Sequence, residues 1–236
     1  MELTFASYNI HKAVGLDRRR DPDRILAVLR EVDADVIALQ EADRRFGDRA
    51  SVLPLQAIDD HTPWRAVPLR MRPGSIGWHG NALLVRRGIA VTGAAAVPLP
   101  MLEPRGAVCA DLLVAGHAVR VVGMHLDLSG LRRRQQVRAV LAHLGATGAV
   151  GSPAVLMGDF NEWARVGGCL REFHHDSWRV LAPGRSFPSR RPIAMLDRIV
   201  ASAEWECLDW GVHHSALAAQ ASDHLPVFAR MILHKK

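Results

Sequence analysis

Short apolar segments of strand length recur along this chain, and six of them carry polar side chains at one end. The polar residues are Asn9, Glu41, His125, Asp159 with Asn161, Asp197, and Asp223 with His224. Segments with the spacing of helices lie between the strands, for example at 131–144. Strands interleaved with helices predict a mixed α/β fold, in which two packed sheets have helices outside them.

Four of the predicted strands follow one another, separated by short turns, and this order indicates consecutive antiparallel strands. They cover 81–85, 89–97, 107–114 and 118–125. Other strands are predicted at the N-terminus and at 34–39, 154–157, 195–200 and 225–232, and Asp21-Pro22 predicts the start of a helix. No repeat or linker divides the chain, so we expect one domain over residues 1–236.

The composition is that of an ordinary globular protein, with 49% hydrophobic and 23% charged residues. It excludes a disordered tail, a collagen and a coiled coil. The chain has no apolar run long enough for a transmembrane helix, and its first ten residues lack the pattern of a signal peptide, so we expect a cytoplasmic protein. The three cysteines, Cys109, Cys169 and Cys207, are expected to be small core residues.

The net charge of +6 comes almost entirely from arginine, because lysine occurs only at Lys12 and in the last two residues. Arginine matches phosphate geometry, so the charge is compatible with an anionic substrate, although a GC-rich genome would produce the same bias. The clusters 18–20 and 132–134 are interpreted either as a rim that faces phosphate or as solvated helix ends.

The polar residues at the strand ends supply carboxylates, amides and histidines without thiolates, which favours Mg²⁺ or Mn²⁺ over zinc. Most of them, taken singly, are explained as turn or core residues. Asp197 is different, because its carboxylate lies in an apolar strand, where burial without a partner is costly. A hard cation with histidine and aspartate suits the hydrolysis of a phosphate ester. The doublets His174-His175 and His213-His214 are assigned no site.

Seven motifs occur in the order found in the endonuclease/exonuclease/phosphatase superfamily, which the chain resembles from Ser7 to Val227. They are SYNIH (7–11), LQE (39–41), GNALL (80–84), HLD (125–127), GDFN (158–161), LDRI (196–199) and SDHLPV (222–227). The resemblance implies a DNase I-like four-layer α/β sandwich, with two mixed, antiparallel-rich sheets and a site where strand ends converge. It also implies a metal-dependent hydrolase that acts on phosphate esters.

The resemblance also implies a role for each matching residue. Glu41 would be the principal ligand of the Mg²⁺ or Mn²⁺ ion, with Asn9 beside it and Asp223 near the metal. Asp159 would activate or orient the attacking water. Asn161 and His125 would hold the phosphate, and Asn81 would contact the substrate. His224 would be positioned by Asp197, which favours its imidazolium form.

The substrate is less well defined by these motifs. His11 stands where apurinic endonucleases of the superfamily carry aspartate, and the EPRGAV run at 103–108 resembles small bacterial stand-alone members. A small phosphate ester or a phospholipid head group is slightly favoured, whereas a DNA or RNA nuclease is the alternative. A lipid-directed enzyme should expose an apolar loop near the site. Segment 97–102 is a candidate for such a loop, although an ordinary strand end is the favoured interpretation of this segment. A non-catalytic binding module is the hypothesis from another class, and the oligomeric state is left open.

Overall fold

The computed structural model describes residues 1–44, 47–69, 74–100, 105–146, 152–173 and 177–234. One group of strands consists of β1 (Glu2–Asn9), β2 (Val36–Gln40), β3 (Trp64–Ala66), β4 (Ala82–Arg86), β11 (Trp205–Val212) and β12 (Val227–Leu233). The other consists of β5 (Ala90–Val97), β6 (Gly106–Val114), β7 (His117–His125), β8 (Ala154–Asp159), β9 (Trp178–Leu181) and β10 (Asp197–Ser202). The helices are α1 (Pro22–Val32), α2 (Leu55–His61), α3 (Gly130–Ala146) and α4 (Ala218–Ala221), with 3₁₀ helices η1 (His11–Ala13) and η2 (Gly168–Phe173).

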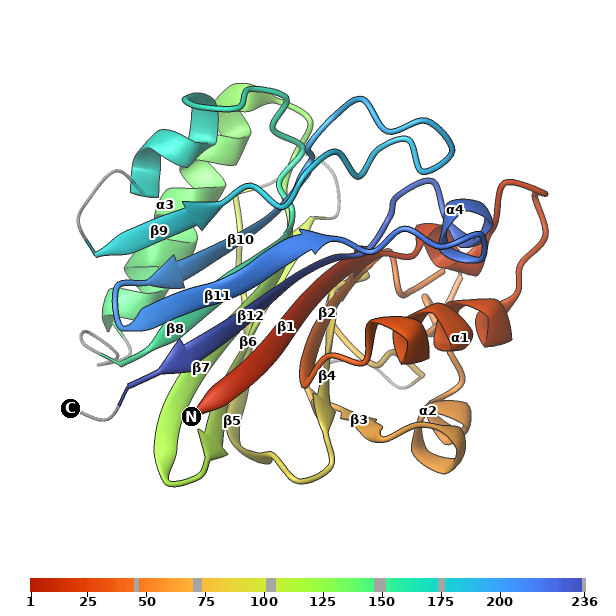
Figure 1. Ribbon diagram of the computed structural model, residues 1–236, viewed down its shortest axis with the longest axis horizontal. Helices are drawn as coiled ribbons and strands as arrows, with labels where there is room; N and C mark the ends of the chain where they lie inside the picture. The colour runs from red at the N-terminus through yellow and green to blue at the C-terminus, as the bar shows by residue number, and fades with distance from the viewer. Residues whose placement is uncertain (45–46, 70–73, 101–104, 147–151, 174–176, 235–236) are drawn as a thin grey trace.

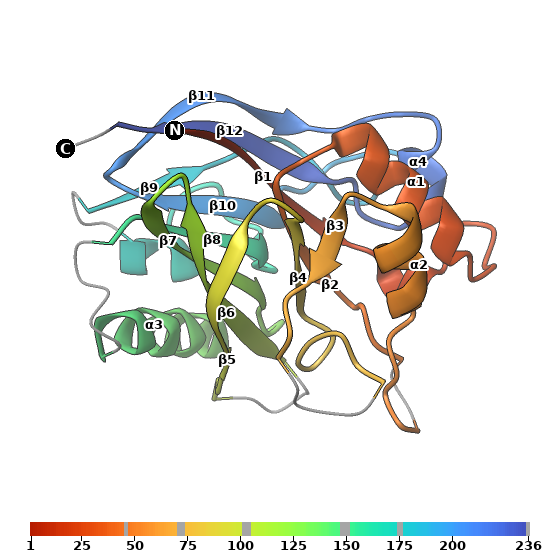
Figure 2. The same ribbon diagram turned by 90° about the horizontal axis from the view of Figure 1, so that it is seen from below.

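Each group of strands forms one six-stranded sheet, and the two sheets pack face to face (Figure 1). The strand orders are β11-β12-β1-β2-β4-β3 and β5-β6-β7-β8-β10-β9. Figure 2 shows α1, α2 and α4 outside the first sheet and α3 outside the second. The four-layer α/β sandwich expected from the sequence is therefore confirmed.

Three apolar clusters hold these layers together. The central one lies between the sheets and contains residues such as Phe5, Val121, Met157 and Ile199. One outer cluster joins α1 to the first sheet, and the other joins α3 and η2 to the second. Burial of these side chains is the main favourable contribution to folding. Two of the cysteines, Cys109 and Cys169, are buried in the core as expected, whereas Cys207 is half-buried.

Local sequence explains where α1 begins. The side chain of Asp21 accepts a hydrogen bond from the backbone N–H of Arg24, and Pro22 occupies the first helical position, as the Asp-Pro pair predicts. The apolar residues Ile25, Leu26, Val28 and Leu29 are buried on one face. Among all helices of the described residues, none is long and apolar enough to cross a membrane.

The predicted run of four consecutive antiparallel strands is wrong at its first step. β4 pairs with β2 and β3 in the first sheet, whereas β5 begins the second sheet. The turn at 87–89 carries the chain from one sheet to the other, and a short turn does not specify which sheet the next strand joins. Three strands were not predicted at all, namely β3, β9 and β11, and each lies at a sheet edge.

The pairing of the central strands brings the polar strand ends together. Parallel pairing places Asn9 of β1 beside Gln40, which precedes Glu41, and His125 of β7 beside Asp159 of β8. Antiparallel pairing places Asp197 of β10 opposite Asp159. Close strand contact requires glycine at 158, because a β-carbon there would lie 1.9 Å from the carbonyl oxygen of Met124. The fold therefore delivers side chains from both sheets to one edge of the sandwich.

Candidate active site

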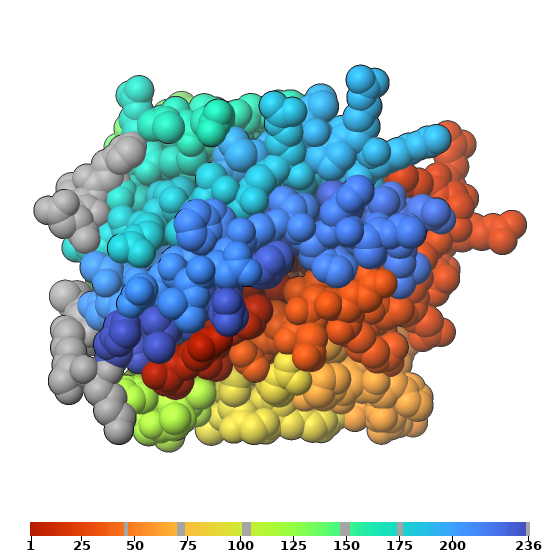
Figure 3. Space-filling model, viewed as in Figure 1, coloured from red at the N-terminus to blue at the C-terminus, as the bar shows by residue number. Residues whose placement is uncertain are grey.

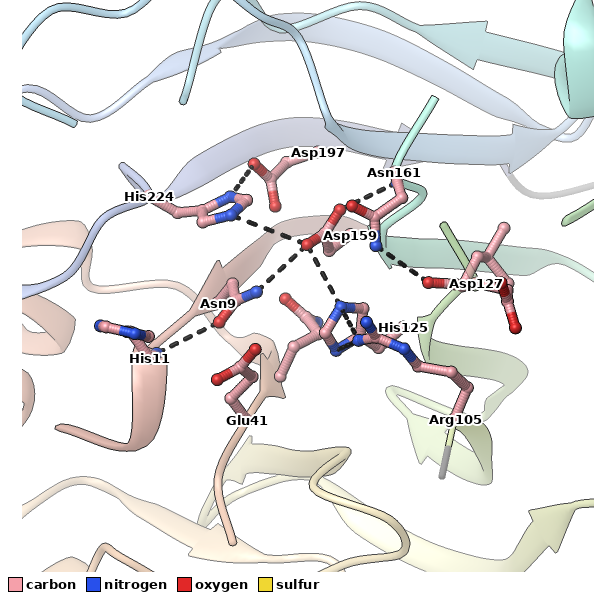
Figure 4. Close-up of polar contacts among 12 residues, drawn as sticks. Asn9, His11, Glu41, Arg105, His125, Asp127, Asp159, Asn161, Asp197 and His224 are labelled. Atoms are coloured by element: carbon pink, nitrogen blue, oxygen red, sulfur yellow. Dashed lines mark hydrogen bonds and ion pairs between the residues drawn. The ribbon is translucent and has the colours of Figure 1, made fainter. Parts of the chain in front are cut away.

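Asp159 lies at the centre of the polar side chains (Figure 4). Its Oδ2 accepts a hydrogen bond of 3.1 Å from Asn9 Nδ2, so this contact joins the two sheets. The same oxygen lies 3.4 Å from His125 Nε2 and 3.7 Å from His224 Nε2. The other oxygen, Oδ1, accepts the backbone N–H of Asn161 at 2.9 Å. The Asp159 carboxylate is 2% exposed, which makes its polar partners decisive for its properties.

His224 is held between two carboxylates. Its Nδ1 lies 2.9 Å from Asp197 Oδ2, and the hydroxyl of Ser186 donates to that same oxygen. Burial by itself would lower the pKa of His224, but the charges of Asp197 and Asp159 and the hydrogen bond to Asp197 raise this pKa to about 10. His224 is therefore an imidazolium at neutral pH, and the carboxylate of Asp197 has its charged partner.

His125 carries the opposite charge state. Burial lowers the pKa of its imidazole to about 3, the charge of Asp159 opposes that shift, and the guanidinium of Arg105 adds to it. Arg105 donates to the His125 ring from the other side of the site (Figure 4). His125 is therefore neutral at pH 7, so the two histidines beside Asp159 differ in charge.

The free energy of unfolding should depend on pH in opposite ways through these two histidines. An unfolded histidine titrates near 6.5. Neutral His125 makes its full contribution to stability above pH 6.5, and this contribution is lost as the pH falls toward 3. Charged His224 makes its full contribution below pH 6.5, and this contribution is lost as the pH rises toward 10. In a plot of the free energy of unfolding against pH, His125→Gln should therefore reduce the slope of the acid limb, below pH 6.5, and His224→Gln that of the alkaline limb, above pH 6.5. Each slope should change by up to about 1.4 kcal/mol per pH unit.

Urea unfolding of both variants and the wild type between pH 4 and pH 9, with metal removed by chelation, measures these slopes. Each variant serves as the control for the other, because its effect should be confined to one limb. Variant curves that run parallel to the wild-type curve on both limbs would contradict the two charge states.

Glu41 follows β2 in the left-handed region, with a φ of 56°, and forms an ion pair with the ammonium of Lys12. The backbone N–H of Lys12 also donates to the carbonyl oxygen of Glu41 at 3.2 Å. Three successive residues, His11, Lys12 and Ala13, have φ values between 45° and 59°. Such a conformation is unfavourable for side chains with a β-carbon and tends to persist at functional sites. Here it places the ammonium of Lys12 against Glu41.

The donor set around Glu41 fits a hard divalent cation. The described residues contain no group of three or more His, Cys, Asp or Glu side chains arranged around one ion position. Glu41 nevertheless already holds one cation, the Lys12 ammonium, and the Oδ1 of Asn9 is turned away from Asp159 and accepts the backbone N–H of His11 at 3.1 Å (Figure 4). A carboxylate and an amide oxygen, completed by water, are ligands that Mg²⁺ and Mn²⁺ accept.

Asp223 is placed differently from Glu41 and Asn9. Its carboxylate accepts a hydrogen bond of 3.3 Å from the neighbouring hydroxyl of Ser222, and its carbonyl oxygen accepts the N–H of Ser189. In the described part of the chain, its hydrogen bonds do not join it to Glu41. The role of Asp223 near a metal therefore stays a prediction.

The two predicted amide contacts to substrate also differ in position. Asn161 adopts a φ of 50°, and its Nδ2 donates to the carbonyl oxygen of Leu126 at 2.9 Å, which fixes it beside Asp159. Asn81 is completely buried, and its Nδ2 faces the carbonyl oxygens of Trp78 and His79 in its own turn, each at 3.4 Å. Within the described residues, its Oδ1 has no hydrogen-bond partner. Asn81 thus lies behind the site edge, and direct contact with substrate stays a prediction.

Three residues of the site were missed by the sequence interpretation: Lys12, Arg105 and Ser186. Lys12 had a signal, since it is the one lysine outside the last two residues and follows the SYNIH motif directly. Arg105 lies in the EPRGAV run, which was noted without a role. No pattern marked Ser186, because its contact with Asp197 depends on how the loop before β10 folds.

Two members of the arginine cluster 132–134, Arg133 and Arg134, are held by carboxylates of the chain and do not form the phosphate-facing rim that was one of the cluster's two interpretations. Arg133 is buried in an ion pair with Glu162 at 3.2 Å, and its Nη1 donates to the carbonyl oxygen of Leu128 at 2.6 Å. Arg134 pairs with Glu172 at 2.9 Å. The physical reason is the position of the cluster in the first turns of α3, where one of three successive side chains must face the protein.

Arg198 and His213 both have partners within the chain. Arg198 is completely buried, and it donates to the carbonyl oxygens of Met195 and Ala164. His213 pairs with Glu31 at 2.8 Å, in keeping with a surface role. His174-His175 lies outside the described residues.

Comparison with known proteins identifies the family. The model of the Endonuclease/Exonuclease/phosphatase family matches residues 6–224. The chain belongs to this family. The chain is also similar to the uncharacterized protein YbhP of Escherichia coli, with 28% identity over an alignment of 210 positions that covers 81% of this chain and 81% of that one.

Solved structures of the family share the fold. An endonuclease/exonuclease/phosphatase from Beutenbergia cavernae matches with a TM-score of 0.75 and 22% identity, over 98% of this chain and 72% of that one. A mannosyl-6-phosphatase of Bacteroides thetaiotaomicron matches with a TM-score of 0.74 and 18% identity, over 98% of this chain and 100% of that one. Members of this family are hydrolases that act on phosphate esters, and they generally use divalent metals.

Proposed function

We propose that this protein is a Mg²⁺- or Mn²⁺-dependent phosphoesterase. The observation that carries the proposal is the buried carboxylate of Asp159, which is held between His125 and His224 and is joined through Asn9 to the edge where Glu41 lies. Glu41 and Asn9 would hold the ion, which when bound neutralises charge on the phosphate. A non-catalytic binding module on the same fold would not need a carboxylate, two histidines and a metal-binding edge in one site, so this set of residues favours an enzyme.

In the proposed reaction, each residue around Asp159 has one task. Asp159 orients the attacking water and accepts its proton, since its carboxylate is the acceptor at the centre of the site. His125 and Asn161 hold oxygens of the phosphate. His224 faces the negative charge that develops on the phosphate, and Asp197 keeps its ring in place through the 2.9 Å contact to Nδ1. Arg105, beside His125, adds a second cation on that side.

A small phosphate ester or a phospholipid head group is favoured over nucleic acid. Binding to a nucleic acid backbone needs a track of basic side chains that contact successive phosphates. Arg133 and Arg134 are held by carboxylates of the same chain, so they do not supply such a track.

The test is hydrolysis of bis-p-nitrophenyl phosphate, p-nitrophenyl phosphate, phospholipids and single- and double-stranded DNA, with Mn²⁺, Mg²⁺ or chelator. We expect ester hydrolysis that requires the added metal and falls at least about 100-fold in Glu41→Gln. Isothermal titration with Mn²⁺ should show weaker binding in this variant and an unchanged fold by circular dichroism. Equal affinity for Mn²⁺ in both proteins would remove Glu41 from the metal site.

Lys12→Met should bind Mn²⁺ more tightly than the wild type, by about tenfold. A divalent ion that binds Glu41 must displace the ammonium of Lys12, and that competition disappears with the methionine side chain, which keeps a similar length. Arg19→Gln is the matched control, because it removes an exposed positive charge from the same stretch of chain without touching Glu41. Weaker Mn²⁺ binding in Lys12→Met would show that the lysine supports the ion instead of competing with it.

A further inference from the structure

Half of the large apolar side chains that the described residues expose lie in three segments next to the site. They are Leu128, Leu131, Trp163, Val166 and Ile193, with exposed fractions between 61% and 78%. The segments, here called the rim loops, are 126–131, which joins β7 to α3 and includes the first two residues of α3, 160–167 between β8 and η2, and 182–196 between β9 and β10. Exposed apolar side chains that gather in one region mark an interaction surface.

The rim loops follow or precede the catalytic strand ends directly. Loop 126–131 begins one residue after His125, loop 160–167 begins one residue after Asp159, and loop 182–196 ends one residue before Asp197. In Figure 1 they lie along the upper side of the molecule, and Figure 3 shows part of loop 182–196 standing out from the surface. A partner that covers the rim loops would therefore lie beside the site.

Two buried arginines brace the rim loops against one another. Arg133 joins the first loop to the second, because it donates to the carbonyl oxygen of Leu128 and to the carboxylate of Glu162. Arg198 joins the second loop to the third through the carbonyl oxygens of Ala164 and Met195. These hydrogen bonds hold the backbone of the rim loops in place, and an ordered backbone lowers the entropy cost of binding a partner through the apolar side chains.

The charge of the rim loops has one sign. Exposed arginines accompany the apolar tips at Arg165, which lies between Trp163 and Val166, and at Arg185, Arg190 and Arg191 in the third loop. The loops contain two acidic residues, Asp127 and Glu162, and both are buried. The surface therefore combines apolar tips with positive charge and exposes no carboxylate within these three described segments.

We propose that the rim loops dock on an anionic phospholipid bilayer. Aliphatic side chains gain free energy by leaving water and entering the acyl boundary, while neighbouring arginines bind anionic head groups. Four of the five exposed apolar side chains are aliphatic, and these offer no ring for stacking on nucleic acid bases. Resting on the phosphoesterase proposed above, the docking implies a substrate phosphate carried at the membrane surface.

In the candidate segment 97–102, the described residues form a strand end, as the favoured interpretation of the sequence had it, and not an exposed apolar loop. Val97 is the last residue of β5 and is 1% exposed, and Leu99 is 6% exposed. Met101 and Leu102 lie outside the described residues. The apolar run in the sequence thus marked a buried strand end. In the rim loops, other residues separate the exposed apolar side chains along the sequence, so no apolar run marks this surface.

The test is co-sedimentation of the full chain with vesicles of phosphatidylcholine alone or with 30% phosphatidylglycerol. We expect binding that is at least tenfold tighter to the anionic vesicles. Trp163→Ser combined with Leu131→Ser should weaken it at least tenfold, and Arg190→Gln combined with Arg191→Gln about 25-fold. The matched controls are Leu113→Ser, in an exposed position on β6, and Arg87→Gln combined with Arg230→Gln, and both should bind like the wild type.

The outcomes separate the docking from the phosphoesterase activity. Vesicle binding by the wild type that the rim variants retain in full would overturn the docking, even if a soluble ester is hydrolysed. Absence of vesicle binding, together with single-stranded DNA binding that Trp163→Ser removes, would overturn it in favour of nucleic acid. Vesicle binding that the rim variants lose, without hydrolysis of any ester, would support the docking and reject the phosphoesterase. Thermal unfolding of each variant checks that the fold is kept.

Discussion

Asp159→Asn is expected to lower the turnover of a phosphodiester by about 10³-fold and to leave the fold intact. Asparagine keeps the size of the side chain but can neither accept a proton from water nor carry the negative charge between His125 and His224. Loss of a general base and of a buried charge together supports an effect of this size. The rate is measured with bis-p-nitrophenyl phosphate at saturating Mn²⁺.

Asp111→Asn is a matched control for this substitution. Asp111 is also a carboxylate on a central region of the second sheet, where it pairs with Arg120 at 2.6 Å, but it lies away from the strand ends of the site. Its replacement should change turnover less than twofold. Turnover in Asp159→Asn within tenfold of the wild type would rule out Asp159 as the base.

Asp197 and His224 are expected to act as one unit. Asp197→Asn and His224→Gln should each lower turnover by about 10²-fold, and the double variant should lose little more than either single one. The reason is the 2.9 Å contact, because His224 without its carboxylate loses both its orientation and the charge that raises its pKa. A double-mutant cycle on kcat measures this coupling.

A pH profile distinguishes this positioning role from a structural one. In the wild type, the alkaline limb of kcat should lie high, near the His224 pKa of about 10. In Asp197→Asn that limb should move to lower pH, because the largest favourable charge next to His224 is gone. Losses that multiply to about 10⁴ in the double variant, or an unmoved limb, would show that the two residues act independently.

The central strands were predictable from the sequence, whereas three of the four edge strands, β3, β9 and β11, were not. β1, β8 and β12 lie between neighbours and against the core, so their apolar residues recur in a strand pattern. β11, with the sequence WECLDWGV, is mostly exposed and shows no such pattern. Strand pairing across the turn at 87–89 was also beyond local reasoning, since it depends on which sheet offers an edge.

The convergence of the polar strand ends was predictable for a related reason. Residues at the ends of central strands are positioned by strand pairing, as the register of Asp159 with His125 and Asp197 shows. The contact of Arg105 with His125 was not predictable, because Arg105 lies in a loop. The sequence marked Lys12 as a singular lysine but not its ion pair with Glu41, which depends on the backbone dihedral angles at 11–13. Arg133 shows the same difficulty in a helix, because the sequence did not indicate that this arginine of the cluster is buried.

The left-handed turn at 11–13 has a consequence for how this protein can evolve. Each of its three residues bears a β-carbon in a conformation that costs roughly 1–2 kcal/mol, and the hydrogen bonds to Asn9, Ile10 and Glu41 hold it there. Glycine at Ala13 would relieve part of that cost and would also free the backbone that aims Lys12 at Glu41. Under the metal role proposed for Glu41, selection for thermal tolerance and selection for metal affinity would act on this turn in opposite directions.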